Sequence, residues 1–370
     1  MATRRQFLAQ MAVASIAAGS VPMVRASNAA APIQPIAPLR KLGVVQTVLG
    51  PISGERMGFT APHEHVLASS TDFMRLWPEY LGGRSRFTSG AVERMKVAKA
   101  AGIDTIVDCT TADLGRDLRL LQEVSRRSGV QIVATTGHWL TPTPSFEART
   151  ADELADFFTL EIERGMEDTG IKPGVIKAAH EGDGMTPFQE KVFRAVARAS
   201  KRTTVPVTTH SDARHRGGEQ QAAIFEQEGL DPRMVCIGHS DESADFDYLA
   251  GLARRGYTLG IDHLFYGLSS MGGGTNGIPT WQDRAAMVKK LIDAGLNDRI
   301  FLANDWMFGA TIAPTGTIDV LNERNPFGNL FNVRNTIPYL RQIGVTDQQI
   351  RTITVENPRH FFGGPLSARP

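Results

Sequence analysis

The sequence contains little cysteine: Cys109 and Cys236 are the only two in 370 residues. They lie far apart, each inside an apolar run, TIVDCTT or RMVCIGH. This spacing is not that of a disulfide framework, and the apolar surroundings favour a small buried residue with a free thiol. We therefore expect two buried free thiols in a chain long enough to bury a large core without cross-links.

An excess of charge of one sign is also absent. The chain has 40 lysine and arginine residues against 39 acidic ones, which gives a formal net charge of +1. No block of basic residues is present that would follow a phosphate backbone. Because nucleic-acid binding depends on such a basic surface, we do not expect a nucleic-acid partner.

Residues 1–26 lack acidic residues and contain three arginines, of which Arg4 and Arg5 are adjacent. The apolar region that follows is short and rich in alanine, glycine and serine, so it does not resemble a membrane span. We interpret residues 1–26 as a twin-arginine signal peptide rather than a frayed amphipathic helix, and the Ala- and Pro-rich residues 27–42 as an extended leader. These assignments predict a periplasmic or secreted protein without a stable membrane anchor in its mature form.

Short β-rich runs recur along the rest of the chain, with helical spacing between them. The eight runs are FTAPHEH, DTIVDCTT, QIVATTG, GVIKAA, VPVTTH, MVCIGHS, YTLGIDH and RIFLAND. Strands that alternate with helices indicate a parallel sheet, and eight such units indicate an α/β fold of the (β/α)8 TIM-barrel type. We expect this barrel over residues 43–362, with an N-terminal β-hairpin at its start and a C-terminal tail at 363–370.

A doubly wound open sheet is the alternative architecture. It predicts a glycine-rich phosphate-binding turn after its first strand, and no such turn follows FTAPHEH. The glycines of MGGGTNG, residues 271–277, are not followed by a Gly-Lys-Ser/Thr helix start. They indicate a flexible loop after the seventh strand.

Polar residues with metal-binding side chains lie at the carboxyl ends of these runs. In a strand, side chains two apart share a face, so His63 and His65 of the first run point the same way. Lys177 lies inside the fourth run among apolar neighbours, where an unpaired ammonium would be costly. The others are His210, His239, Asp262, His263 and Asp305, which end the fifth to the eighth runs. Carboxyl ends of barrel strands converge on one mouth, so we expect one site there.

Several longer motifs carry a resemblance to a known family. GPISGERMGFTAPHEH, GVIKAA, TTHSDARHRGGEQQAAIFEQEGL, CIGHSDES and NDWMFG resemble the phosphotriesterase family of the amidohydrolase superfamily over residues 43–362. The resemblance implies a binuclear metal site at the carboxyl-terminal mouth of the barrel. The metals would be two divalent ions, usually Zn²⁺, for which Co²⁺ or Mn²⁺ substitutes. It also implies a homodimer.

The resemblance further implies how each ligand candidate acts. His63, His65 and Asp305 would hold the more buried ion, and His210 and His239 the more exposed one. Lys177, carbamylated by CO₂, would bridge them. A bridge of this kind is chemically reasonable, because carbamylation converts a costly buried ammonium into a carboxylate with one oxygen for each metal.

The implied activity is hydrolysis of organophosphate triesters, the aryl dialkyl phosphates, with release of the aryl alcohol. A metal-bridging hydroxide would be the nucleophile, and Asp305 would pass its proton to His263. Relatives continue this relay to an aspartate at the position of Glu242. The longer side chain either completes the relay or is a solvated loop carboxylate.

Apolar residues that follow the strand ends would line a pocket for a small-molecule ester. By position these are Trp139, Leu140, Leu114, Phe73, Tyr266 and Phe308, with Trp77 and Phe265 as further candidates. Aromatic and aliphatic walls suit an apolar ester better than a sugar or a nucleotide. The remaining histidines, His138, His180, His215 and His360, match no ligand of the family and are interpreted as structural.

Two other functions remain open. A lactonase or carboxylesterase with promiscuous triesterase activity would use the same metal site, although relatives of that kind tend to carry an arginine after the aspartate of the seventh strand, where this chain has His263. An exported metal-binding protein without catalysis would need the ligands but not the relay of Asp305 and His263.

Overall fold

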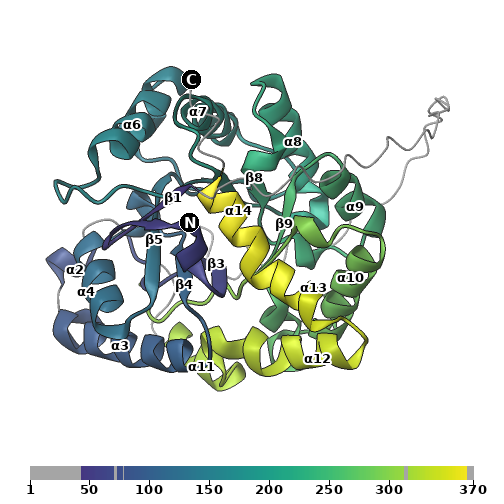
Figure 1. The fold of residues 1–370 in the computed structure, drawn as a ribbon. Helices are drawn as coiled ribbons and strands as arrows, with labels where there is room; N and C mark the ends of the chain where they lie inside the picture. Colours follow the sequence, from purple (N-terminus) through teal and green to yellow (C-terminus); the bar gives the residue numbers. More distant parts are fainter. Residues whose placement is uncertain (1–42, 71–72, 78, 312–315, 365–370) are drawn as a thin grey trace, which may run out of the picture. The chain divides into compact units, whose positions relative to one another are not determined.

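The computed structural model describes residues 43–70, 73–77, 79–311 and 316–364. The signal peptide and the leader expected at 1–42 lie outside these residues, as does most of the tail. The described chain contains a parallel sheet of eight strands in the order β10-β9-β8-β7-β6-β5-β4-β3 and a separate antiparallel pair, β1-β2. Figure 1 shows the helices α3 to α10 arranged around this sheet. The predicted (β/α)8 barrel and its N-terminal hairpin are confirmed.

The strands coincide with the β-rich runs of the sequence. The hairpin consists of β1 (Val44–Thr47) and β2 (Gly50–Ser53). The barrel strands are β3 (Thr60–Glu64), β4 (Thr105–Asp108), β5 (Gln131–Gly137), β6 (Val175–Ala179), β7 (Val207–His210), β8 (Val235–Ile237), β9 (Thr258–Ile261) and β10 (Ile300–Leu302). Every residue of β3, β4 and β6 is buried, which is typical of strands covered by helices on one side and by the barrel interior on the other.

The helices that follow the strands carry their own start signals. The main ones are α3 (Arg84–Ala100), α4 (Leu118–Ser128), α6 (Ala151–Arg164), α7 (Pro187–Thr203), α8 (Gly217–Gln227), α9 (Phe246–Arg254) and α10 (Trp281–Asp293). Capping boxes begin α6, α7 and α10, with Thr150, Thr186 and Thr280 as the N-caps. Each box satisfies two backbone groups that a helix start otherwise leaves unpaired, so these starts are specified locally.

The chain after β10 is helical. It comprises α11 (Thr317–Arg324), α12 (Ile337–Gln342), α13 (Asp347–Arg351) and α14 (Asn357–Gly363). Phe362 of α14 packs with Phe301 of β10 and with Val45 of the hairpin, beside Val133 and Val175 of the barrel strands. Cys109 and Cys236 belong to this same buried cluster. Both cysteines are free and buried, as predicted.

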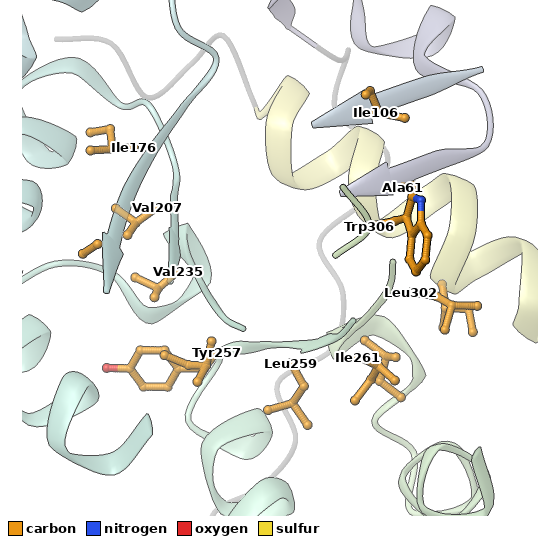
Figure 2. Packing of buried hydrophobic residues seen from close by; sticks show 14 of the residues in the cluster. Ala61, Ile106, Ile176, Val207, Val235, Tyr257, Leu259, Ile261, Leu302 and Trp306 are labelled. Atoms are coloured by element: carbon orange, nitrogen blue, oxygen red, sulfur yellow. The ribbon is translucent and has the colours of Figure 1, made fainter. Parts of the chain in front are cut away.

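A second, larger apolar layer lies between the strands and the surrounding helices. Figure 2 shows part of it, with Ile176, Val207 and Val235 from β6, β7 and β8 and Leu259 from β9. Side chains fill both the interior and this outer layer, so the carboxyl-terminal mouth of the barrel is where polar side chains can meet solvent or a ligand.

Glu64 connects strand β3 to the segment that follows β10. Its Oε1 accepts hydrogen bonds from the backbone N and side-chain Nδ2 of Asn304, at 2.9 and 2.8 Å, and its Oε2 accepts from the backbone N of Trp306 at 3.1 Å. Backbone bonds on either side run from Asp305 N to the oxygen of His63 and from His65 N to the oxygen of Trp306. Burial raises the pKa of this carboxyl well above its usual range. Glu64 therefore locks the segment that carries two ligand candidates against β3.

None of the described helices is both long enough and apolar enough to cross a membrane.

Candidate metal centre

The ligand candidates predicted from the sequence come together at the carboxyl end of the barrel. His63 lies in β3, Lys177 in β6 and His210 at the end of β7, while His239 and Asp305 lie in the loops that follow β8 and β10. The last two have positive φ values, 57° and 47°, which are uncommon for residues other than glycine. Strained backbone of this kind is typical of functional sites.

One group of side chains surrounds Asp305 Oδ1. Its distance is 3.1 Å to His65 Nε2 and 3.8 Å to His63 Nε2. Lys177 Nζ lies 2.6 Å from the same His63 Nε2. These are the residues predicted for the more buried ion, together with the predicted bridge.

A second group lies on the other side of Asp305. His239 Nε2 is 2.7 Å from His210 Nδ1 and 4.0 Å from Asp305 Oδ2. His63, His239 and Asp305 offer ligand atoms that all lie within 4.8 Å of one another. Asp305 thus faces both groups, one through each oxygen.

Each of the four histidines has an oxygen partner on the nitrogen that faces away from the centre. Asp262 Oδ2 contacts His63 Nδ1 at 2.9 Å and Asp262 Oδ1 contacts His239 Nδ1 at 2.8 Å. Thr110 Oγ1 contacts His65 Nδ1 at 2.8 Å. Such partners orient the rings, and a carboxylate partner such as Asp262 also places the N–H on the nitrogen that it contacts.

The fourth histidine is oriented the other way round: Glu181 Oε2 lies 2.5 Å from Nε2 of His210, so Nδ1 faces the centre. Sequence reasoning placed Asp262 at a strand end but gave it no role, and it missed Glu181 and Thr110. For Asp262 the only available signal was an acid beside a histidine at a strand end.

The electrostatics suit neutral imidazole ligands. Burial and the nearby Lys177 hold the pKa of His63 well below its usual range, and burial and His263 do the same for the pKa of His239. Neutral imidazole is the form of histidine that binds a metal ion.

The polar atoms at the centre also need a partner. Asp305 Oδ1 is buried and accepts no well-aligned hydrogen bond among the described residues, although His65 Nε2 lies 3.1 Å away. The histidine nitrogens without a hydrogen-bonded oxygen partner face the same space. Imidazole and carboxylate are donors that zinc and similar divalent ions prefer. The residues therefore fit a divalent metal centre.

Asp305 also begins a chain of polar contacts that leads away from the centre. His263 Nε2 is 2.8 Å from Asp305 Oδ2, and His263 Nδ1 is 3.0 Å from Glu242 Oε1. Burial opposes the charged imidazole, but the hydrogen bonds to Asp305 and Glu242 raise the pKa of His263 well above its usual range. Burial likewise opposes the charged form of Glu242, but the His263 bond lowers the pKa of Glu242 to about 2. The added methylene of Glu242 thus still allows contact with His263.

The backbone under this chain is held by a buried ion pair. Asp241 Oδ1 accepts from the backbone N of Asp262 and of His263, at 3.0 and 3.1 Å. Arg284 of α10 lies 3.2 Å from the other oxygen of Asp241 and donates to the carbonyl of His263 at 3.0 Å. Helix α10 is therefore connected directly to the end of β9.

The predicted pocket residues fall into different environments. Trp139 and Tyr266 lie beside the centre, with ring centroids 6.3 Å from His210 and 4.7 Å from His263. Leu140 is partly exposed. Leu114 and Phe308 are only 4% and 5% exposed, so they present little surface to a ligand in this structure.

Phe73 lies in the short helix α2 (Phe73–Leu76), beside a hollow of about 600 Å³ that Leu76, Trp77, Glu79 and Tyr80 also line. This hollow is lined by apolar surface and contains none of the metal-ligand candidates. The described ligand cluster, with its converging donors and short contacts, is the stronger indication of where the chemistry occurs.

Comparisons with known proteins agree with this geometry. The profile of the Phosphotriesterase family matches residues 43–362. The chain belongs to the phosphotriesterase family. The phosphotriesterase homology protein of Mycobacterium tuberculosis is 35% identical over 329 residues, which cover 86% of this chain and 97% of the relative. An aryldialkylphosphatase of Saccharolobus solfataricus is 33% identical over 324 residues, 84% of this chain and 96% of that protein.

A solved structure of the phosphotriesterase from Mycobacterium tuberculosis superposes with a TM-score of 0.79 at 34% identity, covering 86% of this chain and 98% of that one. Members of the phosphotriesterase family are binuclear metal hydrolases, so the chain is assigned as a hydrolase.

Proposed function

We propose that this protein is a binuclear metal hydrolase that cleaves organophosphate triesters of the aryl dialkyl phosphate type. The observation that carries the assignment as a hydrolase is one carboxylate, Asp305, placed between two groups of imidazoles and in contact with His263 at 2.8 Å. The 33% identity to an aryldialkylphosphatase supports the triester as its substrate class. A site that only stored metal would not require the polar chain that leads from this carboxylate to Glu242.

In this proposal His63, His65 and Asp305 hold the more buried ion, and His210 and His239 the more exposed one. Bound there, two divalent ions, which we propose to be Zn²⁺, would polarise the phosphoryl oxygen and supply hydroxide at neutral pH. The side chains of this protein supply the ligand geometry, the proton acceptor and the wall of the pocket.

Lys177 is proposed to be carbamylated. The residue is 2% exposed, and its amine lies 2.6 Å from His63 Nε2. An ammonium at this place would compete with a metal cation for the same imidazole lone pair. The unprotonated amine would instead add to the carbon of CO₂ and release one proton, and the resulting carbamate anion would offer one oxygen to each ion.

Proton transfer is assigned to the polar chain. Asp305 would accept the proton from the attacking water, and His263 would move it outward to Glu242. The side chain of Glu242 is 22% exposed, compared with 16% for Asp305 and 11% for His263. The proton would therefore pass from Asp305 to the more exposed carboxylate of Glu242.

The substrate class is tested by comparing kcat/KM for an aryl dialkyl phosphate with that for an acyl homoserine lactone, using zinc-loaded enzyme. We expect the triester to be the better substrate and both activities to disappear when the metals are removed by a chelator. A higher kcat/KM for the lactone would instead support the lactonase function. Metal binding without turnover of either ester would support the non-catalytic function.

Export by the twin-arginine route is proposed from Arg4 and Arg5 and from the absence of acidic residues in 1–26. Exchanging both arginines for lysine should leave the precursor in the cytoplasm. Unchanged export of this variant, measured by cell fractionation, would contradict the proposal.

A further inference from the structure

His210 differs from the other candidate metal ligands in the partner that orients it. His63 and His239 both contact Asp262, whose side chain is 1% exposed, and His65 contacts Thr110, which is 2% exposed. Glu181, the partner of His210, has a side chain that is 46% exposed. Three ligand orientations are thus determined inside the protein, and the fourth is determined at its surface.

The contact between Glu181 and His210 selects the tautomer that a metal ligand needs. Nε2 of His210 lies 2.5 Å from Glu181 Oε2. An ionised carboxylate can only accept a hydrogen bond. The Nε2 atom therefore carries the hydrogen, which leaves the lone pair on Nδ1. That Nδ1 is the atom that lies 2.7 Å from His239 Nε2, where the proposed function places the more exposed ion.

The backbone of His210 is held independently of Glu181. Gln221 of α8 donates to the carbonyl of His210 at 2.8 Å, and the backbone N of His180 donates to the same carbonyl at 3.0 Å. Loss of the Glu181 side chain would therefore free the imidazole ring without releasing the end of β7. Because Glu181 is nearly half exposed, its replacement should also leave the fold intact.

We propose that Glu181 is a positioning residue for His210 and that it determines how tightly the more exposed metal ion is held relative to the more buried one. The inference rests on the binuclear site of the proposed function. Partners of this kind typically change metal affinity by about 10–100-fold when they are removed. The more buried ion has no ligand that contacts Glu181 among the described contacts, so the effect should be confined to one of the two sites.

The alternative is that Glu181 acts only through its negative charge at the rim of the barrel. Glu219 provides a matched control, because it is an acidic residue of similar exposure, 45%, in the helix that follows β7, and it pairs with Arg216 at 2.8 Å rather than with a ligand candidate. Replacing Glu219 by alanine removes the same charge without touching His210.

The test is a Zn²⁺ titration of the wild type, Glu181→Ala, Glu181→Gln and Glu219→Ala proteins against a chromophoric chelator, which measures two dissociation constants for each. We expect Glu181→Ala to weaken one of the two dissociation constants by about 10–100-fold and to leave the other unchanged. Glu181→Gln should restore part of the affinity, because the amide oxygen still accepts from Nε2. Glu219→Ala should match the wild type.

Activity provides a second readout. At saturating Zn²⁺, Glu181→Ala should reach most of the wild-type kcat. At low Zn²⁺ the activity of this variant should fall as the more exposed site loses its ion. Equal affinity of both sites in Glu181→Ala and wild type would overturn the inference, and so would equal weakening in Glu181→Ala and Glu219→Ala. A wild-type protein that binds only one Zn²⁺ would instead refute the binuclear site itself, so the two failures are distinguishable.

Discussion

Replacement of Arg284 by methionine would break the buried ion pair beneath the end of β9. The side chains of Arg284 and Asp241 are 3% and 1% exposed, so neither charge has water to replace its partner. The variant loses the contact with Asp241 at 3.2 Å and the hydrogen bond to the carbonyl of His263 at 3.0 Å. An uncompensated charge of this kind costs about 3–5 kcal/mol of unfolding free energy.

The reciprocal change, Asp241→Asn, should have a similar cost. The amide oxygen can still accept from the backbone N of Asp262 and His263, but the guanidinium of Arg284 is left without its counter-charge. In the double variant neither charge remains, and the cost falls to the lost hydrogen bonds, about 1–3 kcal/mol. The double variant is therefore expected to be more stable than either single variant.

The stability of Arg284→Met should also depend on pH. Burial raises the pKa of Asp241, and Arg284 opposes this rise. Without Arg284 the folded-state pKa lies further above the unfolded value of about 3.9, so the folded state binds the proton more tightly. Stability then falls as pH rises from the unfolded pKa toward the folded one, and the cost of the variant should be smaller at pH 5 than at pH 8.

Equilibrium urea unfolding, followed by circular dichroism at a fixed metal concentration, measures these differences. The wild type, the two single variants and the double variant form a complete double-mutant cycle. If the double variant lost as much stability as the sum of the single variants, the two side chains would not be coupled and the reasoning would be refuted. A cost below about 1 kcal/mol for Arg284→Met would refute it as well.

Three further predictions concern the metal centre and its surroundings. Lys177→Ala should lose most activity and regain part of it with added small carboxylates, whereas Lys177→Arg should not respond because its guanidinium stays cationic; near-wild-type kcat/KM in Lys177→Ala without carboxylate would contradict a bridging role. Asp262→Asn should weaken metal binding by about 10–100-fold, because an amide has only one oxygen for the two imidazole N–H groups that Asp262 contacts; an unchanged dissociation constant in chelator competition would speak against this. Burial raises the pKa of the Cys109 and Cys236 thiols, so iodoacetamide should label neither in native protein and both after unfolding, as measured by mass spectrometry; fast labelling of the native protein would show that the thiols are accessible.

Much of the barrel could be predicted because its signals are local. Each strand is a short β-rich run bounded by turns, and all eight predicted runs contain an observed strand. The ligand candidates were recognisable because they stand at the ends of those runs, such as His63 in β3 and His210 in β7. Parallel strands of a barrel deliver their carboxyl ends to one mouth, so this position in the sequence already implies proximity in space.

The contacts that orient these ligands could not be predicted in the same way. Asp262 contacts His63 across 199 residues of sequence, and Glu64 contacts Trp306 across 242. Glu181 follows β6 but contacts the histidine at the end of β7. Which oxygen meets which nitrogen depends on strand register, ring rotation and the closing of the barrel, and no local pattern encodes these.

The sequence by itself therefore determined the order of strands and helices, the free thiols and the identity of the metal-ligand candidates, because propensity, periodicity and motif are properties of neighbouring residues. Only the tertiary structure decided which nitrogen of each histidine faces the centre, that Asp305 lies between two groups of ligands, and that His210 alone is oriented by an exposed carboxylate. These properties arise when side chains from different strands share one small buried volume, where each imidazole can keep a lone pair on only one nitrogen.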